Sequence, residues 1–184
     1  SGEQITRLRE EVKILESALA MIHGGSREAS PLKIENPLPK AQELLELAEA
    51  EDKLAEQIQS RRGEIHFWEP WGDFDPEDIR ALLKRGLVVQ LYEIPSKNLE
   101  KTSLDIVLEV MSIKDGVARC AAISSEKILL SFPSVALPPV GLKDMLSRQE
   151  EDLGQEAMVE SRIQEFSRYD ESFQEALGER QARL

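Results

Sequence analysis

The sequence predicts an α+β fold in which a long antiparallel helical rod, a coiled coil or a small bundle, carries a small α/β lobe at its tip. Residues 1–66 and 141–184 form two predicted arms, because their apolar residues recur at helical spacing. Residues 67–140 form the predicted lobe, since they contain β-branched runs and turn signals. The run 67–86, FWEPWGDFDPEDIRALLKRG, marks the junction and holds both tryptophans of a chain with only 5% aromatic residues.

The outgoing arm, residues 1–66, begins with a heptad helix. Its apolar stripe, spaced alternately three and four residues apart, is Ile5, Leu8, Val12, Leu15, Leu19 and Ile22. Gly24-Gly25 is predicted to end this helix. Residues 24–39, GGSREASPLKIENPLP, contain three prolines and are predicted to form a non-helical linker that breaks the arm.

A second helix is predicted from about Lys40 to His66, with Pro39 at the favoured place just before it. Its stripe consists of Leu44, Leu47, Leu54, Ile58 and Ile65. Glu51 and Arg61 interrupt this stripe at heptad positions, which weakens a coiled coil but can fix its register.

The lobe is predicted to open with a helix over residues 76–85. Asp75 is a good N-cap, Pro76 fits the first helical position and Gly86 stops the helix. Its predicted buried residues are Ile79, Leu82 and Leu83.

Four strands are predicted to follow, over residues 87–94, 104–113, 117–124 and 127–132. Pro95 ends the first of them. Asp115-Gly116 between the second and third strands is a strong hairpin signal.

The returning arm, residues 141–184, has a looser helical stripe and could reach about 65 Å, against about 40 Å for the second helix. The first helix must therefore cover the rest, either end to end with the second helix or beside it. Ser1-Gly2 looks like the remnant of an expression tag, and the final GERQARL stops within a helical pattern. We therefore expect a piece excised from a longer protein.

The composition indicates which kinds of molecule the chain could bind. The net charge is −12 and the isoelectric point is near 4.8, which disfavours nucleic acid and anionic membranes and suits basic protein partners. The single cysteine, Cys120, permits no internal disulfide and indicates a reducing compartment. No signal peptide and no apolar run near 18 residues is present, so this fragment is expected to be soluble.

Motifs for chemistry are absent from the sequence. It contains no P-loop and no G-x-G-x-x-G, so no cofactor and no catalytic residue are predicted. His23 and His66 lie at predicted helix ends, where capping or surface roles suit them better than metal binding. Cys120, in VARCAA, is expected to fill the core of a strand rather than act as a nucleophile.

An acidic cluster surrounds the junction, consisting of Glu69, Asp73, Asp75, Glu77 and Asp78. Asp73-x-Asp75 begins like a calcium loop, but the sixth and twelfth positions hold Asp78 and Lys84 instead of Gly and Glu. Helix capping accounts for most of these carboxylates, so no metal site is predicted. An enzyme or metal binder built on this cluster is kept only as a third hypothesis.

The aromatic residues of the junction have two interpretations. They either pack the lobe against the rod, which we favour, or form in part an exposed anchor for a partner, since tryptophan is common at binding hot spots. The candidate partner-binding residues are Trp68, Trp71 and Phe74.

The order of these features resembles the soluble part of subunit I of V-type and A-type ATPases, called subunit a in eukaryotes. The resemblance rests on Trp71-Gly72-Asp73-Phe74 with the helix to Gly86, the strand Val88–Pro95, and the exit Leu137-Pro138-Pro139 into a helix. Together these stretches follow the family order over nearly the whole chain, and the motifs are moderately specific. The interrupted arm at 24–39 departs from the continuous arm of the family.

The resemblance implies the distal lobe and its two helical arms, without the first, proximal lobe and without the membrane domain. It implies a non-catalytic stator element on the cytoplasmic face of the membrane, held by the peripheral-stalk subunits and supporting proton or sodium transport. The ion and the direction, synthesis or hydrolysis, stay open. The ion-translocating arginine of the family belongs to the missing membrane domain. The alternative interpretation is a generic coiled-coil scaffold or adaptor with a small α/β interaction lobe.

Overall fold

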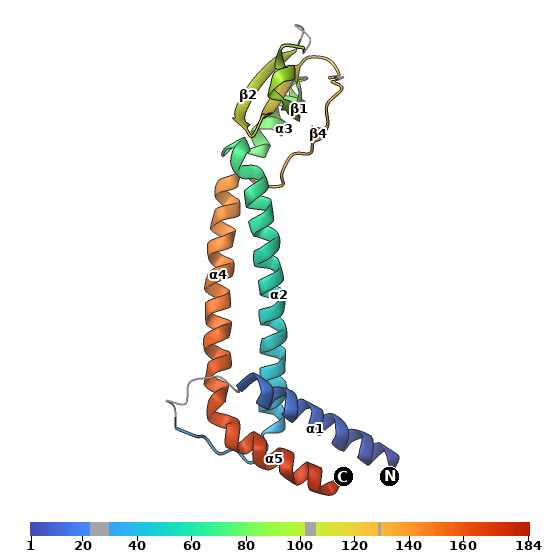
Figure 1. Ribbon diagram of the computed structural model, residues 1–184, viewed down its shortest axis with the longest axis vertical. Helices are drawn as coiled ribbons and strands as arrows, with labels where there is room; N and C mark the ends of the chain where they lie inside the picture. Colours follow the sequence, from blue (N-terminus) through green and yellow to red (C-terminus); the bar gives the residue numbers. More distant parts are fainter. Residues whose placement is uncertain (23–29, 102–105, 129) are drawn as a thin grey trace. The chain divides into compact units, whose positions relative to one another are not determined.

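The computed structural model describes residues 1–22, 30–101, 106–128 and 130–184 (Figure 1). The chain divides into two compact units. Unit 1 comprises Ser1–Ile58 and Asp152–Leu184, and unit 2 comprises Gln59–Glu151. The mixture of helices with one antiparallel sheet confirms the predicted α+β class.

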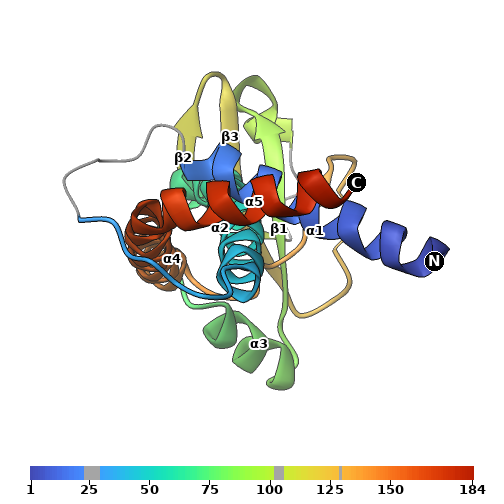
Figure 2. The same cartoon turned by 90° about the horizontal axis from the view of Figure 1, so that it is seen from below.

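Unit 1 is helical. Its helices are α1 (Gly2–Ile22), the first part of α2 (Leu38–Trp68), the last part of α4 (Leu142–Glu165), the 3₁₀ helix η3 (Phe166–Tyr169) and α5 (Asp170–Arg183). Helices α1 and α5 pack together, as Figure 2 shows from below. The buried core of the unit consists of Leu15, Ala18, Leu19, Ile22, Ala41, Leu44, Phe166, Phe173 and Ala176.

The apolar stripes explain this packing, but only part of the α1 stripe is buried. In α1 the stripe is buried from Leu15 onward, whereas Ile5 is exposed. The predicted single return helix is wrong, because η3 interrupts it between α4 and α5. The predicted stop at Gly24-Gly25 and the position of His23 lie outside the described residues.

Residues 30–37 of the predicted linker are non-helical, as expected, whereas its last two residues, Leu38 and Pro39, already belong to α2. Hydrogen bonds hold the non-helical segment against η3 and α5. The Leu32 N–H donates to the Arg168 carbonyl at 2.8 Å. The Ser172 hydroxyl donates to the Leu32 carbonyl at 3.1 Å and accepts from the Ile34 N–H at 3.3 Å. This segment is therefore held by specific polar contacts within unit 1.

Unit 2 contains a four-stranded antiparallel sheet in the order β2-β3-β1-β4. The strands are β1 (Val88–Pro95), β2 (Val107–Lys114), β3 (Val117–Ser124) and β4 (Ser134–Val135). The 3₁₀ helices η1 (Glu69–Trp71) and η2 (Ser96–Lys101) and the helix α3 (Pro76–Lys84) complete the unit with the adjoining ends of α2 and α4. The β2–β3 hairpin turns at Asp115 (φ 53°) and Gly116 (φ 75°), the two positive φ values of the predicted tight turn.

The two faces of the sheet belong to different core clusters. The first face, with Val89, Leu91 and Ala121, packs with residues of α2, η1 and α4, including Trp71 and Met145. The second face, with Tyr92, Ile94 and Cys120, packs against Ile128 and other apolar residues of the segment that follows β3. Alternation along the strands thus places apolar residues on both faces.

Two predictions for this unit are wrong. The described residues of 127–132 are not a strand, and residue 129 lies outside the described part; the fourth strand is Ser134–Val135, which pairs with Leu91 and Tyr92. Ile128 is nevertheless buried, so the apolar run packs on the sheet without joining it. In α3, Ile79 and Leu82 are half-buried as part of the core, but Leu83 is exposed.

Candidate functional site

The junction aromatics form one contiguous cluster in unit 2, the aromatic cluster, consisting of Phe67, Trp68, Trp71 and Phe74. Trp68 is its centre: its ring centroid lies 5.0 Å from that of Phe67, 5.7 Å from that of Trp71 and 6.1 Å from that of Phe74. The Phe67 and Phe74 rings meet Trp68 edge to face, a favourable arrangement for aromatic pairs.

Burial separates the members of the aromatic cluster. Trp71 is 1% exposed and Trp68 is also buried, whereas Phe74 is half-buried and Phe67 is 43% exposed. The Trp71 Nε1 atom is buried and has no hydrogen-bond partner within the described residues. The two tryptophans therefore serve the core of unit 2, and Phe67, which the sequence reasoning did not choose, presents the largest exposed ring surface of the cluster. Partner binding by Trp68, Trp71 and Phe74 stays a prediction.

A second junction contact joins the Trp-Gly-Asp-Phe stretch to the start of α4. The Lys143 backbone N–H donates to Asp73 Oδ1 at 3.2 Å. At Gly141, an added Cβ would lie 2.8 Å from the Phe74 carbonyl oxygen and 3.3 Å from Asp73 Oδ1. Only glycine fits so close to a backbone carbonyl. Asp73 and Gly141 thus fasten two segments that are far apart in the sequence, which no local pattern indicated.

Two other acidic residues of the junction, Asp75 and Glu77, make contacts with residues of α3. Asp75 Oδ1 accepts from the Glu77 N–H at 2.9 Å, which confirms the predicted N-cap. Glu77 forms an ion pair with Arg80 one turn later. Within the described ranges, no group of three or more His, Cys, Asp or Glu residues is arranged to hold a metal ion.

Two other titratable residues singled out in the sequence, His66 and Cys120, lie as expected. His66 is in the last turn of α2 and is exposed. Cys120 is fully buried on the second face of the sheet, and burial raises the pKa of its thiol. A raised pKa disfavours the reactive thiolate, which agrees with a packing role.

Two polar residues of the sheet escaped the sequence reasoning. Arg119 Nε and Nη1 and Ser112 Oγ are buried and have no hydrogen-bond partner in the part of the chain that the structure describes. The two residues face each other across β3 and β2. The sequence did contain an indication of this site, because Arg119 is the one charged residue in the otherwise apolar run VARCAA.

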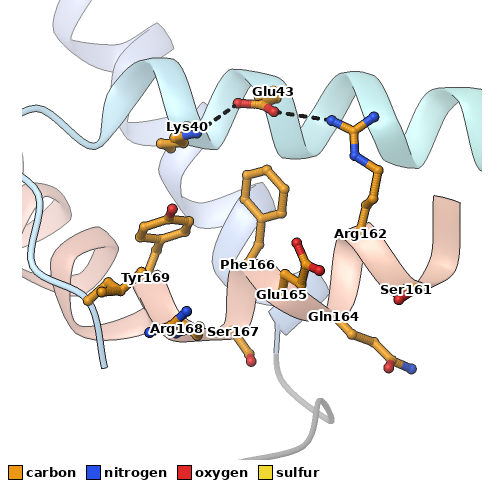
Figure 3. Close-up of a pocket in the computed structure, with 11 residues that line it drawn as sticks. Lys40, Glu43, Ser161, Arg162, Gln164, Glu165, Phe166, Ser167, Arg168 and Tyr169 are labelled. Carbon is orange, nitrogen blue, oxygen red and sulfur yellow. Dashed lines mark hydrogen bonds and ion pairs between the residues drawn. The ribbon is translucent and has the colours of Figure 1, made fainter. Parts of the chain in front are cut away.

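A pocket of about 610 Å³ in unit 1 lies between α2, α4 and η3 (Figure 3). Glu43 lies at its rim, 3.3 Å from Lys40 Nζ and 3.5 Å from Arg162 Nη2. Lys40 Nζ also lies 5.9 Å from the centre of the Tyr169 ring, and Arg168 Nε donates to the Ser30 carbonyl at 3.0 Å. These three cations therefore all contact groups of the chain itself, and the Arg162–Glu43 ion pair joins α4 to α2.

A second pocket of unit 1, about 460 Å³, is acidic. Its carboxylates are Glu51 and Asp52 of α2 and Glu156 and Glu160 of α4. Burial, followed by the charges of Glu160, Asp52 and Glu156, raises the pKa of Glu51. Glu51 is one of the two residues that interrupt the heptad stripe of α2, and this interruption lies in a negatively charged groove.

Comparison with known proteins gives one lead. No protein-family model matches the chain. The chain is similar to a protein named V-type ATP synthase subunit I 1 from Treponema pallidum (strain Nichols), at 28% identity over 122 residues. The match covers 64% of this chain and 20% of that protein, so the chain spans about a fifth of the relative's length. None of the described helices is both long enough and apolar enough to cross a membrane.

Proposed function

We propose that this chain is a cytoplasmic stator part of subunit I of a rotary V-type ATPase and that it anchors peripheral-stalk subunits. The observation that carries the proposal is its similarity to the Treponema pallidum protein named as that subunit. The whole protein is proposed to continue into a membrane domain that carries the ion path, and this chain to catalyse no reaction itself. The similarity supports a subunit role in such an enzyme.

The local structure supports a mechanical role for the stretch that first suggested the family. Trp71 lies in the core of unit 2, and Asp73 holds the first turn of α4. Trp71 and Asp73 thus connect helices and strands of unit 2 to one another. A stator must carry force without changing shape, and buried packing with capped helix ends serves that need.

The proposed arrangement is the one expected from the sequence: a helical rod of residues 1–66 and 141–184 that carries a lobe of residues 67–140. In this arrangement the aromatic cluster is the joint, and Phe67 with Phe74 is the part of it that a stalk subunit can reach. The net charge of −12 suits a basic docking surface on that subunit.

Binding of the chain to the purified peripheral-stalk heterodimer of the same enzyme tests the proposal. Calorimetry at low salt should give a complex of one chain with one heterodimer, and added salt should weaken it, because opposite charges are screened. Absence of binding by a chain whose circular dichroism shows it to be folded would count against the stator role.

A matched pair of variants tests the contact surface. Phe67→Asp should weaken stalk binding about tenfold or more if the exposed ring is an anchor. Leu83→Asp is the control, because Leu83 lies in the same unit and is 44% exposed, close to the 43% of Phe67. Equal effects of the two variants would place the contact away from the aromatic cluster.

A further inference from the structure

The edge strand β2 exposes several large apolar side chains. In the sheet of unit 2, β2 pairs with β3 on one side, and its other edge has no strand partner among the described residues (Figure 1). Four of its eight residues are large apolar side chains that are 37% to 66% exposed: Val107, Val110, Met111 and Ile113. An open edge with exposed apolar side chains is a template for pairing with another strand.

A β-bulge gives this edge a particular pattern. The register shifts between Val110, which lies opposite Cys120, and Ser112, which lies opposite Arg119. Ile113 lies opposite Ala118. Because Cys120 and Ala118 are two residues apart on β3, they share one face of the sheet. The bulge therefore places Val110 and Ile113 on that same face, although they are three residues apart.

The backbone groups of these two residues point to the open edge. In a hairpin with a two-residue turn, the flanking pair, here Lys114 and Val117, is hydrogen-bonded, and pair types alternate from there. The pairs of Ala118 and Cys120 are consequently not hydrogen-bonded. Their partners Ile113 and Val110 thus direct N–H and C=O groups away from β3, where a further strand can accept and donate.

We propose that this edge pairs with the β2 edge of a second copy of the chain, antiparallel and about a two-fold axis. Val110 then lies opposite Ile113 of the second copy, and the symmetry repeats this apolar contact. In the same register Glu109 lies opposite Lys114 of the second copy, again twice. Opposite charges and apolar residues directly across from one another stabilise an antiparallel pair.

The self-complementary register is what identifies the occupant as a second copy. A two-fold interface requires the same patch to match itself, residue i against j and j against i. In the proposed register, the strand Val107–Lys114 meets this condition for Glu109 with Lys114 and for Val110 with Ile113. The pairing also continues the second face of the sheet, where Tyr92, Ile94 and Cys120 already form a buried cluster.

Sedimentation equilibrium of the full chain tests the pairing. At about 0.15 M salt, which screens the repulsion between two acidic copies, we expect a reversible dimer below about 1 mM protein. Val110→Lys and Ile113→Lys should each weaken dimerisation at least about tenfold, because they place a charge in the apolar contact. Met158→Lys is the control, since Met158 is 69% exposed on α4, outside unit 2.

Charge reversal tests the register itself. Glu109→Lys alone and Lys114→Glu alone should each weaken the dimer, because like charges then face each other. The double variant should restore it. An equimolar mixture of the two single variants should prefer the mixed dimer, since every charged side chain at these two positions then faces an opposite charge on the other copy.

Several results would overturn the assignment. These are a chain that stays monomeric at about 1 mM, a dimer that tolerates Val110→Lys and Ile113→Lys, and a mixture without preference for the mixed dimer. Hydrogen exchange adds an independent readout, because the amides of Val110 and Ile113 should become protected as the chain concentration rises. Protection of these amides only when another protein is added would assign the edge to that protein's strand instead.

Discussion

The Lys143 backbone N–H donates to Asp73 Oδ1 at 3.2 Å, across 70 residues of sequence. Lys143 is the second residue of α4, where backbone N–H groups have no partner within the helix. The Asp73 carboxylate satisfies one of them and also lies at the positive end of the helix dipole. Together with the close approach of Gly141 to the Phe74 carbonyl, this contact joins the start of α4 to the stretch that follows η1.

Asp73→Ala should therefore destabilise unit 2 by about 1 kcal/mol, the usual cost of losing a capping side chain. Asp73→Asn should retain most of the stability, because its side-chain oxygen still accepts from Lys143. Both tryptophans lie in unit 2, so urea denaturation followed by tryptophan fluorescence measures the change. An equal loss in the two variants would show that the charge, and not the hydrogen bond, stabilises this end of α4.

Gly141→Ala should cost about 1 to 3 kcal/mol, because the new methyl group would lie 2.8 Å from the Phe74 carbonyl oxygen and the backbone must move. Gly154→Ala is the matched control. Gly154 lies within α4, and an added Cβ there meets nothing within 4 Å. This control should gain about 0.5 to 1 kcal/mol from helix propensity. Thermal unfolding should move the two variants in opposite directions.

The features predicted correctly from the sequence are those determined by neighbouring residues. Asp75 caps α3 through the Glu77 N–H two residues away, and Gly86, with φ of 88°, follows its end. Asp115-Gly116 makes the β2–β3 turn for the same reason, because the positive φ values belong to the turn residues themselves. Caps and tight turns are short-range, so a single sequence is enough to predict them.

The features that the sequence did not predict depend on distant partners. The run 127–132 has the composition of a strand, but β1 pairs with Ser134–Val135 instead. Asp73 was grouped with its acidic neighbours, whereas its partner Lys143 lies far along the chain. Local composition carries no information on which of two nearby segments completes a ladder, or on which helix a carboxylate caps.

Trp71→Ala should destabilise unit 2 by about 3 to 5 kcal/mol, because the ring is almost completely buried and its removal leaves a cavity. Phe67→Ala in the same cluster should cost less, about 1 kcal/mol, since Phe67 is 43% exposed whereas Trp71 is 1% exposed. Tryptophan fluorescence reports unfolding in both variants, because Trp68 is present in each. A Trp71→Ala protein of unchanged stability would contradict the core role of this ring.

Glu51→Gln should stabilise unit 1 at neutral pH and flatten its pH dependence. Burial and the nearby carboxylates raise the pKa of Glu51 above its ordinary value of 4.5. A raised pKa means that the folded state binds the proton more tightly, so this group favours folding below pH 4.5 and loses that contribution as pH rises through its raised pKa. Glutamine stays uncharged throughout. Melting temperatures by circular dichroism at several pH values from about 4 to 8 should show a gain for Glu51→Gln that grows with pH.

Replacing an arginine by methionine should lower the stability at Arg180, which forms an ion pair, but not at Arg119, which forms none within the described residues. Arg180 Nε lies 2.9 Å from Glu11 Oε2, and both side chains are mostly buried, whereas Arg119 Nε and Nη1 are buried without a partner among the described residues. Arg180→Met should destabilise unit 1 by about 1 to 3 kcal/mol, because it removes the closer of the two arginines that pair with Glu11 among the described residues and leaves Arg7, 3.4 Å away. Arg119→Met should leave the stability of unit 2 unchanged or raise it by about 1 kcal/mol, since an unsatisfied buried donor costs free energy that an apolar side chain does not.

Chemical denaturation measures both changes, followed by circular dichroism for Arg180→Met and by tryptophan fluorescence for Arg119→Met. A loss in Arg119→Met as large as that in Arg180→Met would mean that the guanidinium of Arg119 makes a stabilising contact in solution.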